Sequence, residues 1–502
     1  MNYFSLFKGF HVFGNALTVS LVILAKVFAD PIDSYWQQKV DYDMDIVLHD
    51  SIRQITGKTT IKYTNNSPDS LDKLYMHLYP NAFQVGSVKY REYIGNSGRE
   101  SRASYFKSRL KGFTSKIDIH EFAVAMPKDG SSWIHKTPIL KMFEIDDTIL
   151  KAKLFKKIAP GSTVRVDLKW THHVGDMVER AGFFEGQYNM AQWYPKLVVY
   201  DENGWHPDVF HAEGEFYGEF GDFKVNFDIP FDFIIAASGV VVKGDPGWES
   251  VSVDTSIEYN IWLDLYNSSY KESSETRRRE VSFLAENVHD FAWFADKRFH
   301  VLKGEVELPN SKKKVTLWSM FTNNEAELWR NSIEYIHDAI YYYSLWNGDY
   351  KYKHCIAVDG TISAGSGMEY PNITIIGEMK NSYLLEEVIV HEVGHNWFYG
   401  MLANNERKYP WLDEGINSHN ELRYMRLKYP NYNSQTHEMP SFIKKLFDLD
   451  KYTNKQMNWE LGYLMNAWIA KDQPIALGSK QFTYENYFDI AYGKAAIAFD
   501  YL

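Results

Sequence analysis

Cysteine is nearly absent from this chain of 502 residues, since Cys355 is the only one. A single thiol excludes a disulfide within the chain and disfavours a structural zinc site built on thiolates. Basic residues are also in the minority, because 54 Lys and Arg stand against 65 Asp and Glu, for a formal net charge of -11. This balance argues against nucleic acid or an anionic membrane surface as the main partner, because both need clustered positive charge.

The first 29 residues have the pattern of a secretory signal. Lys8 is followed by an apolar run of ten residues from Ala16 to Ala25, and then by the small residue Ala29. Ten residues are too few to span a bilayer, which takes about 20, so we expect cleavage after Ala29 and no stable membrane insertion. An uncleaved anchor is the alternative. The prediction is an exported protein, periplasmic, cell-surface or extracellular, and the lack of disulfides favours a bacterial envelope.

Two sections of different character follow. From Tyr35 to about Val242, short alternating runs are separated by Asn, Gly, Pro and Asp, which predicts many short strands in a sandwich or saddle-shaped sheet. From about residue 298, apolar residues recur at helical spacing, as in "EAELWRNSIEYIHDAIYYYSLW". We therefore expect an α+β multidomain protein, with a signal peptide over 1–29, an all-β domain over 30–298 and a mainly helical domain over 299–502.

The segment "VIVHEVGHNWFYGML" has the HExxH arrangement, in which His391 and His395 are four residues apart and Glu392 follows the first. Residues four apart lie on one face of a helix, so the two imidazoles can point at one metal ion. Glu392 would then lie beside a water on that metal. The alternative is two ordinary helix histidines, satisfied by solvent or by the core.

Glu414 in "WLDEG" favours the metal site. Eighteen residues separate it from His395, enough to end one helix, turn through "NNERKYP" and begin another. Two histidines and a carboxylate leave one coordination position for water, which is how catalytic zinc is held. We predict one zinc ion on His391, His395 and Glu414, although cobalt or manganese could substitute.

Together these motifs resemble the zinc aminopeptidases of the aminopeptidase N and leukotriene hydrolase family, which are gluzincin metallopeptidases. The family's GxMEN motif is matched by "GSGMEYPN" from Gly365 to Asn372, with Tyr370 in place of the asparagine. Its Tyr-x-Lys-Gly-Ala element resembles "AYGKAA", with Ala495 where glycine is usual. The segments "LYMHLYPN" and "QWYPK" extend the likeness over most of residues 35–502.

The resemblance implies a fold as well as a site. It predicts that residues 299–502 form a thermolysin-like, mainly helical catalytic domain behind the β domain. Family members usually continue into a helical domain that closes the cleft. Because the sequence stops within the amphipathic segment "YENYFDIAYGKAAIAFDYL", we expect a carboxy-terminally truncated chain.

The resemblance also implies catalytic roles. Glu392 acts as general base and then as general acid, and Tyr492 donates a hydrogen bond to the oxyanion, with Tyr487 as the rival tyrosine. Glu369 binds the free α-ammonium of a peptide, which sets the distance from the amino terminus to the zinc and makes the enzyme an aminopeptidase.

The same resemblance places further residues around the substrate and the metal. Gly365 and Gly367 would let an extended substrate approach closely, and Met368 belongs to the same substrate-binding stretch. Gln192 is predicted to contact the substrate amine, with an interface or core-edge role as the alternative. Glu421, seven residues after Glu414 on the same helical face, is predicted to bind a zinc-binding histidine, with a solvated surface glutamate as the alternative.

The predicted function is a zinc-dependent aminopeptidase that removes amino-terminal residues from peptides. Two alternatives stay open at this point. A thermolysin-like endopeptidase uses the same metal ligands and would also cleave a peptide with a blocked amino terminus. An inactive, truncated family member would bind peptides without cleaving them.

Overall fold

The alternating runs of the first half fold into strands in the computed structural model, which describes residues 35–96, 109–128, 132–138, 143–248, 276–360, 367–430, 439–446, 448–449, 460–483 and 486–502. The predicted signal peptide and Gly365 lie outside these ranges. Among the described residues, no helix has both the length and the apolar character that crossing a membrane requires.

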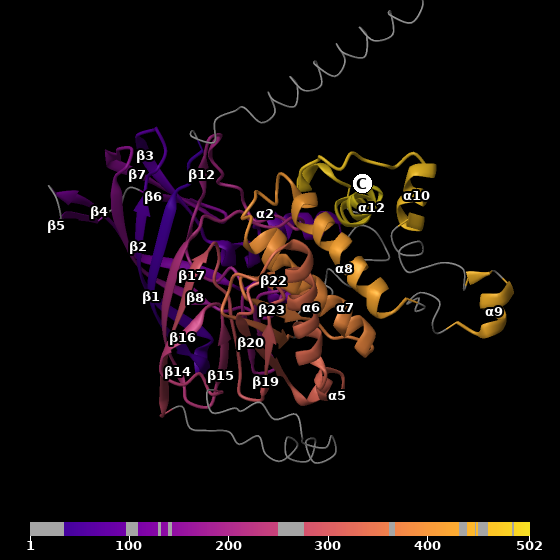
Figure 1. Ribbon diagram of the computed structural model, residues 1–502. Helices are drawn as coiled ribbons and strands as arrows, with labels where there is room; N and C mark the ends of the chain where they lie inside the picture. Colours follow the sequence, from indigo (N-terminus) through magenta and orange to yellow (C-terminus); the bar gives the residue numbers. More distant parts are fainter. Residues whose placement is uncertain are drawn as a thin grey trace, which may run out of the picture. The chain divides into compact units, whose positions relative to one another are not determined.

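One sheet of eight strands dominates the first half (Figure 1). β14 pairs with β1 in parallel, whereas the other neighbours in this sheet are antiparallel. Burial alternates along β1 and β2, so one face of these strands packs into the core and the other meets solvent. In spatial order the strands are β16 (Val240–Lys243), β17 (Arg278–Val288), β14 (Gly221–Pro230), β1 (Lys39–His49), β2 (Gln54–Thr64), β8 (Thr163–His173), β4 (Lys116–Lys128) and β5 (Ser132–Pro138).

Smaller sheets and helical turns complete the first half. One sheet consists of β15 (Ile234–Ala237), β18 (Trp293–Asp296), β10 (Gln187–Met190) and β9 (Gly182–Phe184). Another consists of β11 (Lys196–Leu197), β3 (Leu71–His77), β7 (Ile149–Ile158) and β6 (Phe143–Asp146), and β12 (Tyr200–Asp201) pairs with β13 (Gly204–Trp205). The helical pieces are η2 (Asp50–Ile52), η3 (Tyr79–Phe83), α2 (Val88–Asn96) and η4 (Leu110–Gly112).

Buried tryptophans belong to the core cluster that these sheets share. Trp170 on β8 is buried against Gly57 on the neighbouring β2, where a Cβ would come within 2.1 Å of the indole ring. The indole Nε1 donates a hydrogen bond to Thr59 Oγ1 at 2.9 Å, so the polar end of the ring is satisfied inside the core. Trp193 and Trp293 extend the same cluster.

The second half contains a five-stranded sheet that the sequence analysis did not predict. Its order is β19 (His300–Glu307), β20 (Lys314–Phe321), β21 (His354–Asp359), β23 (Ile373–Ile376) and β22 (Gly367–Tyr370), with β20, β21 and β23 parallel and β22 antiparallel at the edge. β21 and β23 are short and buried at every position. Periodicity does not separate such runs from a buried helix, which is why the prediction favoured helices throughout this half.

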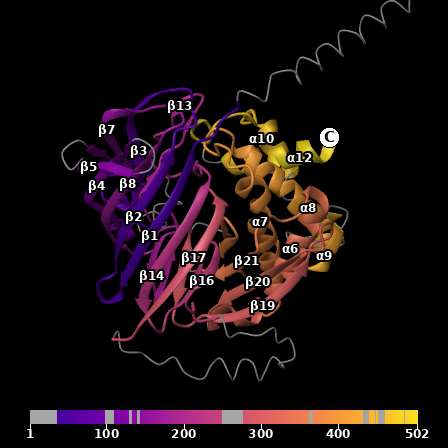
Figure 2. The ribbon, with the colours of Figure 1, turned by 60° about the vertical axis from the view of Figure 1, so that its left-hand side comes forward.

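Helices pack beside this sheet and carry the predicted metal ligands (Figure 2). α7 contacts α6, α8, β22 and β23, and its buried side chains Ile389 and Val393 share a core cluster with Ile340 and Tyr343 of α6. The helical elements are η5 (Asn323–Glu325), α5 (Ala326–Trp329), α6 (Ser332–Asn347), α7 (Ser382–His395), η6 (Asn396–Gly400), η7 (Trp411–Gly415), α8 (Ile416–Lys428), α9 (Ser441–Leu446), α10 (Leu461–Trp468), η10 (Ser479–Gln481), η11 (Tyr487–Lys494) and α12 (Ala495–Tyr501).

The chain is thus an α+β protein with several sheets. Residues from Gln38 on cluster into one compact unit. The boundary near residue 298 that the change of pattern suggests stays a prediction.

Candidate active site

The HExxH segment lies in the last two turns of α7. The side chain of Asn381 accepts a hydrogen bond from the backbone N–H of Leu384 at 3.0 Å, which caps the start of this helix. The helix ends at His395, where the backbone continues into the π-helical turn η6. These boundaries place His391 and His395 one turn apart, as the spacing predicts.

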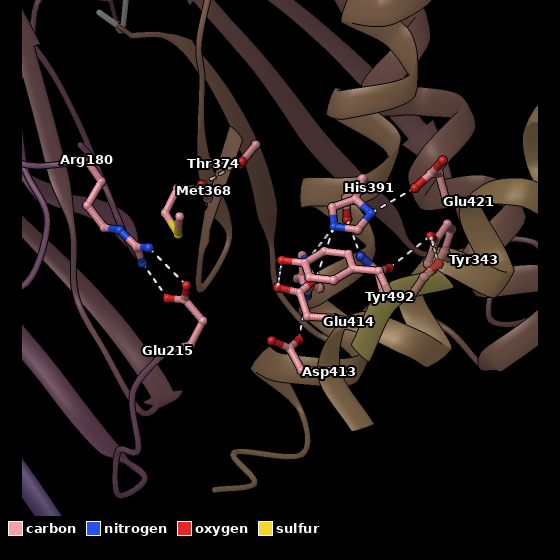
Figure 3. A network of polar contacts seen from close by, with 12 residues as sticks. Arg180, Glu215, Tyr343, Met368, Thr374, His391, Asp413, Glu414, Glu421 and Tyr492 are labelled. Carbon is pink, nitrogen blue, oxygen red and sulfur yellow. Dashed lines mark hydrogen bonds and ion pairs between the residues drawn. The ribbon is translucent and has the colours of Figure 1, made fainter. Parts of the chain in front are cut away.

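The ligand atoms of the three predicted metal ligands all lie within 4.8 Å of one another. Figure 3 shows two of them, His391 and Glu414, side by side. The Nε2 atoms of His391 and His395 are 3.1 Å apart, and Glu414 Oε2 lies 3.3 Å from the first and 3.4 Å from the second. A tetrahedral zinc ion with bonds of about 2.0–2.1 Å separates its ligand atoms by about 3.3 Å. We call these three ligand atoms, from His391, His395 and Glu414, the metal triangle. The metal triangle has the size that zinc needs, and its two imidazoles and one carboxylate suit that ion.

Close packing of η7 against η11 and α12 positions Glu414. Its neighbour Gly415 has no room for a side chain, because a Cβ there would lie 2.4 Å from Ala495 Cβ and 2.9 Å from the carbonyl oxygen of Ala491. This contact brings η11 against η7, and the Tyr492 hydroxyl donates to Glu414 Oε1 at 2.5 Å. Burial and the Glu414 carboxylate raise the pKa of Tyr492 well above its usual value, so the phenol keeps its proton.

Nδ1 of each histidine, the ring nitrogen outside the metal triangle, binds a carboxylate. Glu421 Oε2 lies 2.9 Å from His391 Nδ1, and Asp413 Oδ1 lies 2.5 Å from His395 Nδ1. When Nδ1 carries the hydrogen, the lone pair of Nε2 faces the centre of the triangle, which is the tautomer that a metal requires. The sequence analysis did not single out Asp413, although its position directly before Glu414 was a usable signal.

The carboxylates around the metal triangle favour a bound cation. Burial opposes a charged His391, but Glu414 and Glu421 outweigh it and raise its pKa to about 10. Burial also opposes the ionised form of Glu414, yet the charges of His395 and His391 hold its pKa below the usual range. The same carboxylates that draw protons to the two imidazoles would stabilise a divalent ion in their place.

Glu392 lies against the edge strand of the sheet. A Cβ on Gly367 would lie 2.5 Å from both Cγ and Oε1 of Glu392, so only glycine lets β22 pass this close. Within the described residues, Oε2 of Glu392 has no hydrogen-bond partner. Burial raises the pKa of Glu392 to about 7, which suits a group that exchanges protons near neutral pH.

β22 also carries Glu369 beside the metal triangle. A carboxylate oxygen of Glu369, a ring nitrogen of His395 and a carboxylate oxygen of Asp413 all lie within 4.8 Å of one another. The carbonyl of Met368 accepts a hydrogen bond from Thr374 Oγ1 at 2.9 Å, which fixes the strand on β23. The predicted substrate residues Gly367, Met368 and Glu369 therefore follow one another along a single strand next to Glu392.

Gln192 lies near this strand but has another partner. Tyr370, which stands at the asparagine position of the GxMEN pattern, donates its hydroxyl to Gln192 Oε1 at 3.1 Å. Gln192 is buried and has a φ of 46°, in the left-handed region. Its contact with a substrate amine stays a prediction.

An ion pair that the sequence analysis missed flanks the site. Arg180 binds Glu215 through both terminal nitrogens, with Nη2 2.9 Å from Oε1 and Nη1 in contact with Oε2. Figure 3 shows this pair on the far side of Met368 from His391. Its partners are 35 residues apart in the first half of the chain, and no local spacing pattern indicates them.

Removing the carboxylate behind His395 is expected to weaken zinc binding. Asp413→Ala leaves His395 Nδ1 without the acceptor that orients it, and such changes lower metal affinity about 10- to 100-fold. Competition with a chelator of known affinity measures the change. Asp228→Asn, on β14 of the eight-stranded sheet, is the control and should leave the affinity unchanged. Equal affinities for all three proteins would mean that Asp413 does not orient the ligand.

Comparison with known proteins gives a fold. No protein-family model matches the sequence, and no curated protein matches it either. The M1 zinc metallopeptidase of Deinococcus radiodurans has a similar structure, with a TM-score of 0.53 and 13% identity over 93% of this chain and 83% of that one. A variant of that enzyme bound to a Tyr-Ser-Ala substrate has the same TM-score and identity over 92% and 82% of the two chains. This chain therefore shares the fold of M1 zinc metallopeptidases.

Proposed function

We propose that this chain is a zinc-dependent aminopeptidase of the M1 family. The observation that carries the proposal is the place of Glu369, a buried carboxylate within 4.8 Å of His395 and Asp413, directly beside the metal triangle. A carboxylate this close to a metal ligand can bind the charged α-ammonium of a peptide, and the first peptide bond of that substrate then lies at the metal. The shared fold and the size of the triangle support the same function.

The residues around the triangle divide the chemistry. A zinc ion held by His391, His395 and Glu414 would supply Lewis acidity toward the scissile carbonyl and toward a water. Glu392 accepts the proton of that water and later passes it to the departing amine. Tyr492, whose hydroxyl lies beside Glu414, donates a hydrogen bond to the carbonyl oxygen as negative charge develops there.

The substrate backbone pairs with β22. This strand is the edge of the five-stranded sheet, so its outer N–H and C=O groups can bind an extended peptide. Gly367 brings the edge close to Glu392, and Glu369 follows two residues later at the position of the peptide's amino terminus. Extended pairing thus sets the register, and the carboxylate selects the end of the peptide.

The two alternatives have less support. A thermolysin-like endopeptidase needs the same ligands but has no use for a buried anionic group next to them. An inactive peptide-binding protein would not need Glu392 packed against Gly367, or a Tyr492 hydroxyl that donates to Glu414.

The proposal also includes a thermolysin-like arrangement of residues 299–502, peptides as substrates and an exported location.

A pair of peptides tests the function. A short peptide with a free amino terminus should be cleaved at its first bond, and its N-acetylated twin should be cleaved at least about 100-fold more slowly because acetylation removes the charge that Glu369 binds. A zinc chelator should abolish the activity, and added zinc should restore it. Equal cleavage of both peptides would establish an endopeptidase instead. Cleavage of neither by the zinc-loaded protein would leave a peptide-binding protein.

A further inference from the structure

Asn417 joins the two helical segments that carry the metal ligands, and the proposed mechanism gives it no role. It is buried at the start of α8, three residues after Glu414 and four before Glu421. Its Nδ2 donates a hydrogen bond of 2.7 Å to the backbone carbonyl oxygen of His391 on α7. A carbonyl oxygen has two lone pairs, so it can accept this bond in addition to one within its own helix. The amide therefore connects α8 to the backbone of the first metal ligand.

Tyr343 of α6 sets the direction of this amide. The Tyr343 hydroxyl lies 3.0 Å from Asn417 Oδ1 and 3.2 Å from the backbone carbonyl oxygen of the same residue. Burial raises the pKa of Tyr343 well above its usual value, so the phenol keeps its proton and donates it. Because the amide oxygen accepts from the phenol, the amide nitrogen is the end that faces His391. Three helices, α6, α7 and α8, thus meet at one buried amide.

Gly394 provides the space for this meeting. It lies in the HExxH segment of α7, where glycine is less favourable to a helix than alanine. A Cβ on Gly394 would lie 2.2 Å from Asn417 Oδ1 and 2.5 Å from Cε1 and Cζ of Tyr343. Nonbonded carbon atoms pack about 3.5–4.0 Å apart, so alanine would displace one of these side chains. The helix thus has a less favourable residue where α6 and α8 reach its backbone.

The segment formed by η7 and α8 holds His391 at three points. Glu414 lies 3.3 Å from its Nε2, Glu421 lies 2.9 Å from its Nδ1, and Asn417 binds its carbonyl oxygen. The carboxylates contact the imidazole ring, which can rotate, whereas the amide binds the backbone of α7. Two corners of the metal triangle come from α7 and one from η7. A shift of α8 along α7 would therefore change the metal triangle, and the Asn417 bond opposes that shift.

Resting on the proposed function of a zinc enzyme, we propose that Asn417 is a positioning residue of the metal site. Together with Tyr343 and Gly394 it fixes the position of η7 and α8 along α7, and so determines how tightly and in what geometry the metal triangle holds zinc. Ligands that are already in place bind a metal more tightly than ligands that must first rearrange. Loss of a group that supports the ligands typically lowers metal affinity about 10- to 100-fold.

Asn417→Leu tests the bond with little change in side-chain size. Leucine has the branched shape of asparagine but no donor, so the His391 carbonyl loses its bond from α8. Zinc affinity, from competition with a chelator of known affinity, should fall about 10- to 100-fold. In the cobalt-loaded protein, the visible d–d absorption, which reports coordination geometry, should also change. Tyr343→Phe removes only a hydroxyl and should change both readouts less but in the same direction, so it provides the test if the leucine variant does not fold.

Tyr424→Phe is the matched control. Tyr424 lies on α8, and its hydroxyl contacts Glu386 of α7 and Asp338 of α6, so it joins the same three helices. Glu386 precedes His391 by more than one helical turn. Loss of this hydroxyl should lower Tm, because a buried carboxylate loses a hydrogen-bond donor. It should leave the zinc affinity and the cobalt spectrum as they are in the native protein.

Gly394→Ala tests the same contact from α7. The added methyl group must displace Asn417 or Tyr343, so zinc affinity should fall. In an Asn417→Ala background the methyl group has room and the amide bond is already lost, so Gly394→Ala should lower the affinity much less. Additive losses would mean that the two residues act on the metal separately, which would overturn the inference.

The outcomes separate this inference from the function on which it rests. Native zinc affinity and an unchanged cobalt spectrum in Asn417→Leu would overturn the inference and leave the aminopeptidase intact. Equal losses of affinity in Asn417→Leu and Tyr424→Phe would also overturn it, because both would then reflect helix packing in general. If the native protein binds no zinc, the proposed function fails and the inference fails with it. A loss of affinity at Asn417 and Tyr343 that Tyr424→Phe does not share supports the inference.

Discussion

Glu392→Gln is expected to lower kcat about 10²- to 10⁴-fold while the protein keeps its zinc and its stability. The amide has the size of the carboxylate, so it fits the narrow space over Gly367, where Cγ and Oε1 of Glu392 already occupy the place of a Cβ. An amide cannot accept the proton of a water at neutral pH. The metal triangle does not include Glu392 and should bind its ion as before.

Three measurements on purified protein decide this prediction. Steady-state kinetics on a free peptide gives kcat, metal analysis gives zinc per chain, and thermal unfolding gives Tm. Glu387→Gln is the control, because this residue lies on the same helix one turn before His391, carries the same side chain and does not belong to the metal triangle. It should retain activity. Activity above a tenth of normal in Glu392→Gln would mean that another group is the base.

The metal triangle was predictable because helix geometry and chain length determine it. Two residues four apart on a helix share a face, and 18 residues suffice for a turn and a return, so His391, His395 and Glu414 could be placed together from spacing alone. The neighbours that tune the triangle were less accessible. The family resemblance indicated Glu421, but Asp413, whose carboxylate oxygen lies 2.5 Å from His395 Nδ1, was not singled out, because no periodicity encodes the direction of a side chain beside a ligand.

The fold was also predictable only in part. Alternation correctly indicated strands before residue 242, since burial along β1 and β2 alternates at each residue. It could not indicate that β14 pairs with β1 in parallel across more than 170 residues, because strand order depends on packing between distant segments. It also missed β22 at the edge of the five-stranded sheet, although this strand positions Glu369.

Glu369→Gln is expected to lower kcat/KM for a free peptide about 10²- to 10³-fold and to have little effect on an N-acetylated one. The buried carboxylate gains a charge-assisted hydrogen bond with the α-ammonium, and the glutamine amide cannot replace its charge. An acetylated peptide has no ammonium to lose. In Glu369→Gln, acetylation of the peptide should therefore lower kcat/KM far less than it does in the native protein.

The two peptides and two proteins form a cycle whose interaction energy belongs to the contact between Glu369 and the ammonium. This matters because Glu369 also lies within 4.8 Å of His395 and Asp413, so its loss could act through the metal ligand instead. A disturbed ligand would slow both peptides equally, and zinc affinity would fall with activity. A selective loss on the free peptide, at unchanged zinc affinity, can arise only from recognition of the amino terminus. The cycle thus distinguishes an exopeptidase anchor from a carboxylate that merely supports the metal.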